Sequence, residues 1–315
     1  AWQNRVARSR PFCDAQVLGG HNSAIALADG YGVLDGFWTK ALHLIDRKWE
    51  NEVVKTHNQL VSLTDQLRLG ARFLELDVHW VAGELRIAHC GGWSSARVDG
   101  VVARLNAWAA KVGLPQWRWD SETVGCSPSL SSIPVRKQRS FRSALEEVRQ
   151  WAAQPENSQE LVMLFLDDQA DLETFGVTGA LREELLRAFG GGLFTPEDLA
   201  AAGGAWPTMQ EMVDAGRRVL VMSGSAYPDL GPVVFHKADI CGWQEPGLEA
   251  LDPETCTIGG QAPGAAGRIF RMNACELRYG PLGCDGGPGP NGPPLDPGRL
   301  RRAAACGVNL PSPDG

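Results

Sequence analysis

The stretch that decides the fold is Arg72-Phe-Leu-Glu-Leu-Asp-Val-His79. Successive side chains of a β-strand point to opposite faces, so Glu75, Asp77 and His79 share one face and three aliphatic residues occupy the other. A strand covered on both faces is normally an almost continuous apolar run. Buried carboxylates need a cation, a basic partner or access to water, because an uncompensated buried charge is costly. The pattern therefore predicts a strand that carries a charged, metal-binding site.

Apolar or β-rich runs recur along the chain, with helical patterns between several of them. Alternation of strand, helix and strand predicts an α/β fold with a parallel sheet. Eight such units close most simply as a (β/α)8 TIM-type barrel, whose reactive residues lie at the carboxyl ends of its strands. The predicted strands are 16–19, 72–79, 84–89, 161–167, 218–222, 232–236, 268–272 and 308–310, and the predicted helices lie within 101–112, 141–152 and 181–190.

The chain length of 315 residues fits one large α/β domain, so we expect a single barrel over residues 1–315. Two segments interrupt the regular pattern. An insertion at about 24–58 follows the first predicted strand, and a plain structural excursion is favoured there over a lid across the barrel mouth. The Gly- and Pro-rich stretch at about 252–297 is expected to form surface loops.

Composition excludes some classes of partner. The formal net charge is −7, and no Lys/Arg block is interleaved with aromatic residues, so a nucleic-acid partner is not expected. No apolar run approaches the roughly 18 residues that a membrane-spanning helix needs. We expect a monomer.

The eight cysteines form an even set, half of them within Cys241–Cys284. One interpretation is a secreted or extracytoplasmic protein with disulfides, and the other is a set of buried free thiols in an intracellular protein. No Cys-x-x-Cys pair or His-Cys zinc spacing occurs. We expect the secreted or extracytoplasmic location, with disulfides of undetermined pairing.

Three motifs combine histidines with acidic residues: His21-Asn22-Ser23, Gln66-Leu-x-x-Gly-x-Arg-Phe-Leu-Glu-Leu-Asp77 and Ile87-Ala-His89-Cys-Gly. Together they resemble the X region of phosphatidylinositol-specific phospholipase C, over the first half of the chain. The later run Leu161–Asp168 looks like that family's strand that ends in an acidic metal ligand. The second half resembles the family only in its pattern of elements.

The resemblance implies a phospholipase C-like barrel that cleaves a phosphoinositide-type phosphodiester through a cyclic inositol phosphate. It implies a catalytic pair, His21 and His89, and a calcium site formed by Asn22, Glu75, Asp77 and Asp167. The chemistry of these ligands agrees independently, because one amide and three carboxylates form an all-oxygen set. Such a set suits Ca²⁺, with Mg²⁺ as the alternative, whereas Zn²⁺ prefers imidazole or thiolate ligands.

Roles for three residues follow as hypotheses. His89 is assigned as general acid for the leaving oxygen, His21 as the group that stabilises the phosphorane, and Glu75 or another metal-bound carboxylate as general base. Two departures from the family bear on the site. The calcium-type family usually has glutamate where Asp167 stands, so Asp168 is an alternative ligand, and no arginine replaces the cation as in the metal-independent branch.

Two alternative functions remain open from the sequence. Glycerophosphodiesterases and sphingomyelinase-D-like enzymes resemble the same pattern, but the Asn after His21 and the His-Cys-Gly after the third strand favour the phospholipase C type. The second alternative is an inactive barrel that binds lipid or inositol phosphate. The substrate is expected to be a phospholipid or a soluble phosphodiester, with peripheral membrane contact through aromatics such as Phe37 and Trp38.

Overall fold

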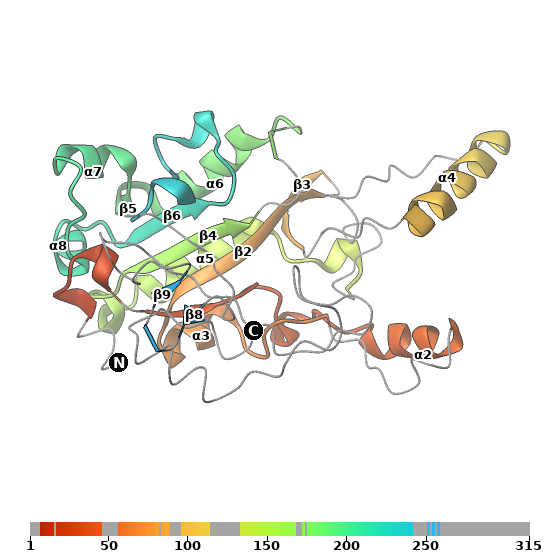
Figure 1. Ribbon diagram of the computed structural model, residues 1–315, viewed down its shortest axis with the longest axis horizontal. Coiled ribbons are helices and arrows are strands. Elements are labelled where there is room, and N and C mark those ends of the chain that lie inside the picture. The colour runs from red at the N-terminus through yellow and green to blue at the C-terminus, as the bar shows by residue number, and fades with distance from the viewer. Residues whose placement is uncertain are drawn as a thin grey trace.

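The computed structural model describes residues 7–15, 17–45, 56–81, 83–88, 96–113, 133–167, 172–173, 175–241, 251–252, 254–255 and 257–258. A mostly parallel sheet runs through the centre of the protein, with helices beside it (Figure 1). The strands are β1 (Leu18–Gly20), β2 (Ala71–Val81), β3 (Glu84–Ile87), β4 (Val162–Asp167), β5 (Leu193–Phe194), β6 (Val219–Ser223), β7 (Phe235–His236), β8 (Leu251–Asp252) and β9 (Thr257–Ile258). The α-helices are α2 (Asp35–Ile45), α3 (Leu63–Leu69), α4 (Ala96–Lys111), α5 (Phe141–Ala152), α6 (Thr178–Phe189), α7 (Pro196–Ala201) and α8 (Met209–Asp214).

The main sheet has the order β1-β2-β4-β6-β5, with β3 paired to β2 and β7 paired to β6. The pairs β1–β2, β2–β4, β4–β6, β5–β6 and β6–β7 are parallel. The predicted α/β class with a parallel sheet is therefore confirmed. Closure of this sheet into an eight-stranded barrel stays a prediction, and the predicted strands 268–272 and 308–310 lie outside the described residues.

One predicted strand is paired differently from the expectation. The run 84–89 was expected to be a further parallel unit, but β3 pairs antiparallel with β2, with Val78 opposite Ile87 and Val81 opposite Glu84. Only two residues separate β2 from β3, whereas a parallel neighbour needs a crossover of a dozen residues or more. The short connection thus forces a hairpin.

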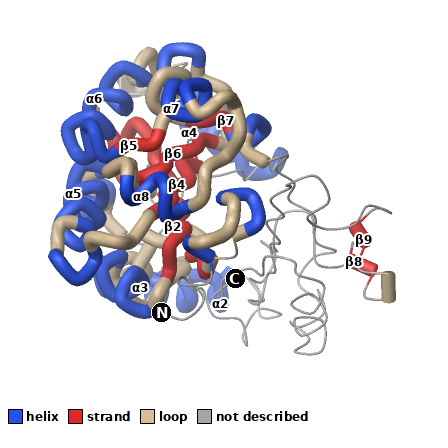
Figure 2. The backbone as a smooth tube through the Cα atoms, turned by 90° about the vertical axis from the view of Figure 1, so that its left-hand side faces the viewer, coloured by secondary structure: helices blue, strands red, loops and turns tan. Residues whose placement is uncertain are grey.

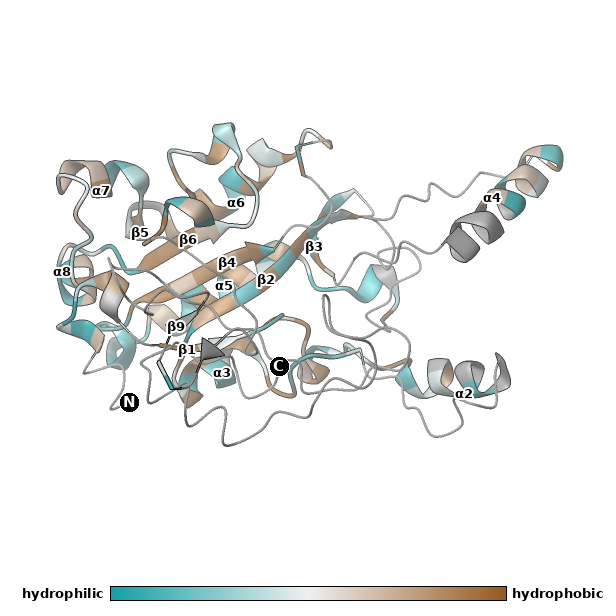
Figure 3. Ribbon diagram, in the orientation of Figure 1, coloured by the Kyte–Doolittle hydropathy of each residue, from teal (hydrophilic) through white to brown (hydrophobic). Residues whose placement is uncertain are grey.

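The helices α3, α5 and α6 lie along one face of the sheet (Figure 2). That face is apolar because the strands present aliphatic side chains to it, as the hydropathy colouring of Figure 3 illustrates. Leu74, Leu164 and Val221 from three adjacent strands are fully buried there, together with Phe141 and Leu145 of α5. Burial of each such side chain contributes about 1.5–3 kcal/mol relative to exposure. The predicted helices at 141–152 and 181–190 correspond to α5 and α6.

The opposite face of the sheet holds a second apolar cluster. Met163, Phe165 and Met222 belong to it, and Phe73 stacks on Phe165 with ring centroids 6.0 Å apart. Phe235 of β7 joins the same cluster. Since the apolar cluster includes Phe73 near the start of β2, the charged residues of β2 come after it, toward the carboxyl end of the strand.

The insertion predicted at about 24–58 contains a short 3-10 turn at Leu27–Asp29 and then α2. Both α2 and α4 stand apart from the sheet, on the side toward which β2 and β4 run (Figure 1). The predicted helix at 101–112 corresponds to α4. Most of the Gly- and Pro-rich stretch 252–297 lies outside the described residues, apart from part of the β8–β9 hairpin at its start.

A disulfide joins Cys13, before β1, to Cys241, after β7, with the two Cα atoms 5.5 Å apart. The expectation of a disulfide is thus confirmed for one pair, while the other six cysteines lie outside the described residues. The bridge spans 228 positions of sequence and encloses every strand of the main sheet. In the chain-entropy picture, cross-links that enclose long loops restrict the unfolded chain most.

We predict that the double variant Cys13→Ser/Cys241→Ser loses about 5 kcal/mol of unfolding free energy, because the unfolded chain regains the freedom of this loop. For a domain of this size the melting temperature should fall by roughly 10–20 °C. Thermal unfolding followed by circular dichroism measures the change. Oxidised wild type serves as the reference, and equal stability of the variant and oxidised wild type would contradict the prediction.

Candidate active site

The charged face predicted for β2 is present. Glu75 and Asp77 are 2% exposed and His79 is 1% exposed. On the other side of the strand, Leu74 and Leu76 are fully buried among the helices. Because side chains alternate along the strand, the two carboxylates and the imidazole point away from the helical layer. Their positions in the sequence place them toward the carboxyl end of β2.

His21 follows β1 directly, and the parallel pairing of β1 with β2 brings it beside Glu75. Gly20, the last residue of β1, is in register with Leu74, one position before Glu75. The His21 Nε2 atom lies 4.0 Å from Glu75 Oε2. The His21 side chain is 39% exposed, whereas that of Glu75 is 3% exposed. The imidazole thus stands at the solvent edge of a buried carboxylate, as expected for a group that meets a substrate from outside.

Asn22 connects the His21 turn to Asp77. Its backbone has φ +46°, a left-handed conformation that asparagine tolerates better than most residues, and its side chain is buried. With its amide nitrogen turned toward Asp77, Asn22 donates to Oδ1 at 2.8 Å and Oδ2 at 3.3 Å. The amide oxygen of Asn22, turned there instead, could ligate a cation together with Asp77.

Asp167 ends β4 and is in register with Asp77 of β2. The Asp167 residue is half-buried. Its Oδ1 atom lies near Gly224, the residue that follows β6, and a Cβ added to this glycine would stand 4.0 Å from that oxygen. The predicted alternative ligand Asp168 and the predicted catalytic residue His89 both lie outside the described residues. Within the described ranges, no three His, Cys, Asp or Glu side chains converge closely enough to hold a metal ion.

Tyr31, which the sequence did not single out, supports the strand that leads to His89. Its buried hydroxyl donates to the Ile87 carbonyl at 2.7 Å and accepts from the Arg139 amide at 3.1 Å. Burial raises the pKa of this hydroxyl well above its usual range, so it remains a donor. The Ile87 amide donates to the Arg139 carbonyl at 2.8 Å, and the next amide, of Ala88, donates to the Asp77 carbonyl at 3.2 Å. These bonds fix the end of β3 against β2.

The Arg139 side chain connects this hydrogen-bonded group to the helical layer. Its guanidinium lies 3.4 Å from Asp29 and 2.5 Å from Glu147. Burial opposes ionisation of Glu147, but hydrogen bonds from Thr64 and the charge of Arg139 outweigh it and lower the Glu147 pKa. Burial raises the pKa of Asp29, despite the same guanidinium. No short motif marks this cluster, because its members lie far apart in sequence.

Comparison with family models agrees with the architecture. Residues 131–228 match the model described as PI-PLC X 1. The predicted resemblance to the PI-PLC X-region family is confirmed. The matched stretch contains α5, β4, α6 and β6, and of the predicted site residues it includes Asp167 and its alternative Asp168. The resemblance was expected chiefly in the first half of the chain. The matched X-domain stretch instead begins after the motifs that contain His21, Glu75 and His89. Comparisons with curated proteins and with solved structures found no match.

The sheet links the two parts of this site. β4, inside the matched X-domain stretch, pairs in parallel with β2, so Asp167 of the matched stretch and Asp77 of the earlier motif end neighbouring strands. The carboxyl ends of parallel strands meet at one edge of a sheet. The structure therefore brings His21, Asn22, Glu75 and Asp77 together and sets Asp167 beside them on the next strand.

Gly20 permits the close approach of the His21 turn. A Cβ at this position would lie 2.5 Å from Ser23 Oγ and 2.8 Å from Gln66 Oε1, both in buried residues. We predict that Gly20→Ala destabilises the protein by about 1–3 kcal/mol and displaces the turn, because these neighbours have no free space to move into. Chemical denaturation measures the change in unfolding free energy.

Gly179→Ala is the matched control. It lies in α6, and an added Cβ there would meet nothing within 4 Å. Replacing glycine by alanine inside a helix should stabilise by about 0.5–1 kcal/mol. Equal effects of the two substitutions would contradict the steric argument for Gly20.

Proposed function

We propose that the protein is a metal-dependent phosphoric diester hydrolase of the phospholipase C type, acting on a phosphoinositide-type substrate through a cyclic inositol phosphate. The observation that carries the proposal is the placement of His21 beside Glu75 and of Asn22 beside Asp77, on strands adjoining a matched X-domain stretch. An exposed imidazole next to buried carboxylates at strand ends is an arrangement suited to proton transfer and charge stabilisation.

The four proposed metal ligands fit calcium by their chemistry. Asn22, Glu75, Asp77 and Asp167 offer only oxygen atoms, and two of them, Asn22 and Asp77, are already in contact. Magnesium is the alternative cation. A bound cation would offset the negative charge of the phosphate and lower the pKa of a coordinated hydroxyl.

The proposed chemistry is attack of the inositol 2-hydroxyl on phosphorus with expulsion of the diacylglycerol oxygen. Glu75 would accept the hydroxyl proton. Because Glu75 is buried, bulk water would not compete with it for this proton. His21 would stabilise charge on the phosphoryl oxygens from the solvent side. His89 would protonate the leaving oxygen, a role taken from the family resemblance.

We predict that wild type releases inositol phosphate from phosphatidylinositol in Ca²⁺ and not in chelator. His21→Ala should lower kcat by about 100-fold or more, the usual contribution of a positioned acid, base or charge-stabilising group. His57→Ala is the matched control, because its imidazole lies 3.4 Å from Asp35, which is not a predicted site residue. Product release is followed by chromatography, with lysophosphatidylcholine and glycerophosphoinositol tested in parallel.

Each other outcome of this assay points to a different function. Choline or glycerol release would transfer the proposal to a sphingomyelinase-D-like or glycerophosphodiester hydrolase. Retained lipid binding without product would indicate an inactive binding barrel. A His89→Ala variant at full rate would remove that residue from the general-acid role.

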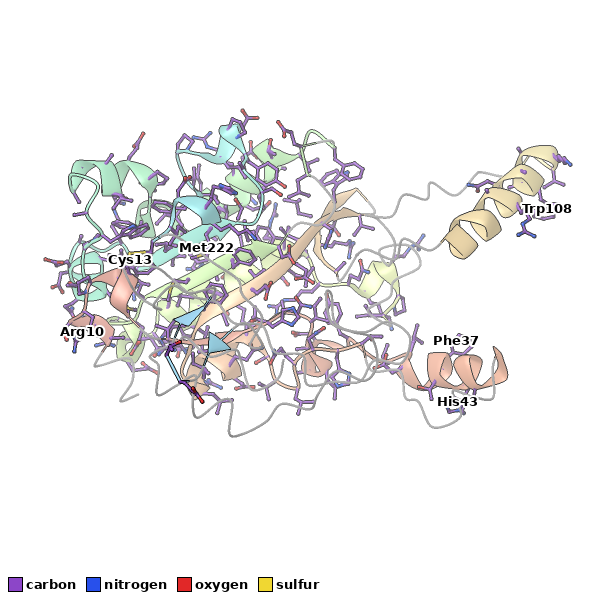
Figure 4. All side chains as sticks on the ribbon, viewed as in Figure 1. Arg10, Cys13, Phe37, His43, Trp108 and Met222 are labelled. Carbon is purple, nitrogen blue, oxygen red and sulfur yellow. A yellow bond between two sulfur atoms is a disulfide. The ribbon has the colours of Figure 1, made fainter. Side chains whose placement is uncertain are left out.

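For partners we propose peripheral contact with a lipid surface by a monomer, without nucleic acid. Among the described helices, none has the length and hydropathy to cross a membrane. Phe37 of α2 is 62% exposed and Trp108 of α4 is 58% exposed (Figure 4). Lys40 and Lys111 on the same helices are exposed and would favour an anionic surface. The Cys13–Cys241 disulfide supports a secreted or extracytoplasmic location.

We predict that Phe37→Ala/Trp108→Ala weakens binding to phosphatidylinositol-containing vesicles by roughly 10-fold, equivalent to about 1.4 kcal/mol of lost apolar burial. Vesicle sedimentation measures the partitioning. Leu186→Ala on α6 is the control, since this side chain is also exposed, at 39%, but lies on a helix that covers the sheet. Equal binding of all three proteins would favour a soluble substrate.

A further inference from the structure

The turn that carries His21 and Asn22 is held by two glutamine side chains. Gln59 Nε2 donates to the His21 carbonyl at 2.8 Å, and Gln66 Nε2 donates to the Ser23 carbonyl at 2.8 Å. Gln59 is 2% exposed and Gln66 is 6% exposed. The carbonyl groups on both sides of Asn22 are therefore each bonded to a buried amide.

Gln59 is itself fixed by its backbone. Its amide donates to the Ile25 carbonyl at 3.2 Å, and its carbonyl accepts from the Leu27 amide at 2.8 Å. Gln66 lies in α3 and donates a second hydrogen bond, to the Val61 carbonyl at 3.1 Å. Both glutamines thus belong to rigid segments that come after the insertion, about 40 residues beyond the turn they hold.

Three further hydrogen bonds hold the turn. The Ile25 amide donates to the Asn22 carbonyl at 2.8 Å, and the Ser23 amide donates to the Glu75 carbonyl at 2.7 Å. Ser23 Oγ donates to the Gly20 carbonyl at 2.9 Å. Because the carbonyls of His21 and Ser23 are hydrogen-bonded, rotation about the backbone of Asn22 is restricted and its positive φ is maintained. The directions of the His21 ring and the Asn22 amide follow from that backbone.

We propose that Gln59 and Gln66 are positioning residues that set the orientation of His21 toward Glu75 and of Asn22 toward Asp77. The inference deepens the proposed function and rests on it for its catalytic meaning. Both act through the backbone carbonyls beside Asn22, to which their amides donate. Removing one donor should loosen the turn while leaving the sheet in place.

The test replaces Gln59 by methionine, which has a similar length but cannot donate a hydrogen bond. Gln59→Met should lower kcat about 10-fold and leave KM within about twofold, because the substrate-binding surface is retained while the catalytic groups lose their alignment. Calcium affinity, measured by titration calorimetry with the metal alone, should fall several-fold since Asn22 is a proposed ligand. Gln66→Met should act in the same direction.

Gln138→Met is the matched control. Gln138 is 3% exposed, and its side-chain amide has no hydrogen-bond partner within the described part of the chain. The Gln138→Met variant therefore loses a buried amide without loosening the turn, and its kcat should equal that of wild type. Nuclear magnetic resonance of the His21 ring, assigned with His21→Gln, gives a readout independent of turnover. The His21 signals should shift and broaden in Gln59→Met and stay unchanged in Gln138→Met.

The outcomes separate the two proposals. If wild type is active and Gln59→Met keeps full kcat with an unchanged His21 spectrum, the positioning inference is overturned and the proposed function stands. If wild type hydrolyses no phosphodiester, the proposed function fails, and the His21 spectrum alone decides the inference. If Gln59→Met and Gln138→Met lose kcat equally, the effect is general destabilisation, which also overturns it.

Discussion

Burial of two carboxylates on one strand is the constraint on which this site depends. Glu75 and Asp77 lie almost fully inside the protein, where an ionised group without compensation is very unfavourable. β1 and the turn after it bring the His21 imidazole to within 4.0 Å of Glu75 and the Asn22 amide into contact with Asp77. The parallel pairing of β1 with β2 therefore places polar groups against the charged face of β2.

The rest of the architecture keeps these groups in place. The apolar face of the sheet packs on α3, α5 and α6, so β2 cannot slip by one residue without moving its carboxylates into the helical layer. The stack of Phe73 on Phe165 fills the opposite face on the amino-terminal side of Glu75. Tyr31 and Arg139 hold the end of β3 at Ile87, and the Cys13–Cys241 bridge joins the two ends of the main sheet region.

Local patterns predicted several elements correctly. The alternation within 72–79, the helical spacing of 141–152 and the apolar run 161–167 each depend on residues close in sequence, so their periods were readable directly. The pairing of 84–89 was predicted wrongly as a parallel unit, because strand propensity does not specify the neighbour, whereas a two-residue connection does. The short strand β5, only Leu193–Phe194, gave too brief a pattern to detect.

The candidate site divides in the same way. The sequence by itself determined the chemical groups, which are two motif histidines, an asparagine and three carboxylates at the ends of apolar runs. It also determined the match of residues 131–228 to the PI-PLC X family model. The tertiary structure alone decided which of these groups meet, placing His21 beside Glu75 and Asn22 beside Asp77. It also selected Gln59, Gln66 and Tyr31 as their supports, through bonds to backbone carbonyls. The reason is physical: side-chain chemistry is encoded at each position, but contacts to backbone carbonyls between distant segments arise only when the sheet has formed.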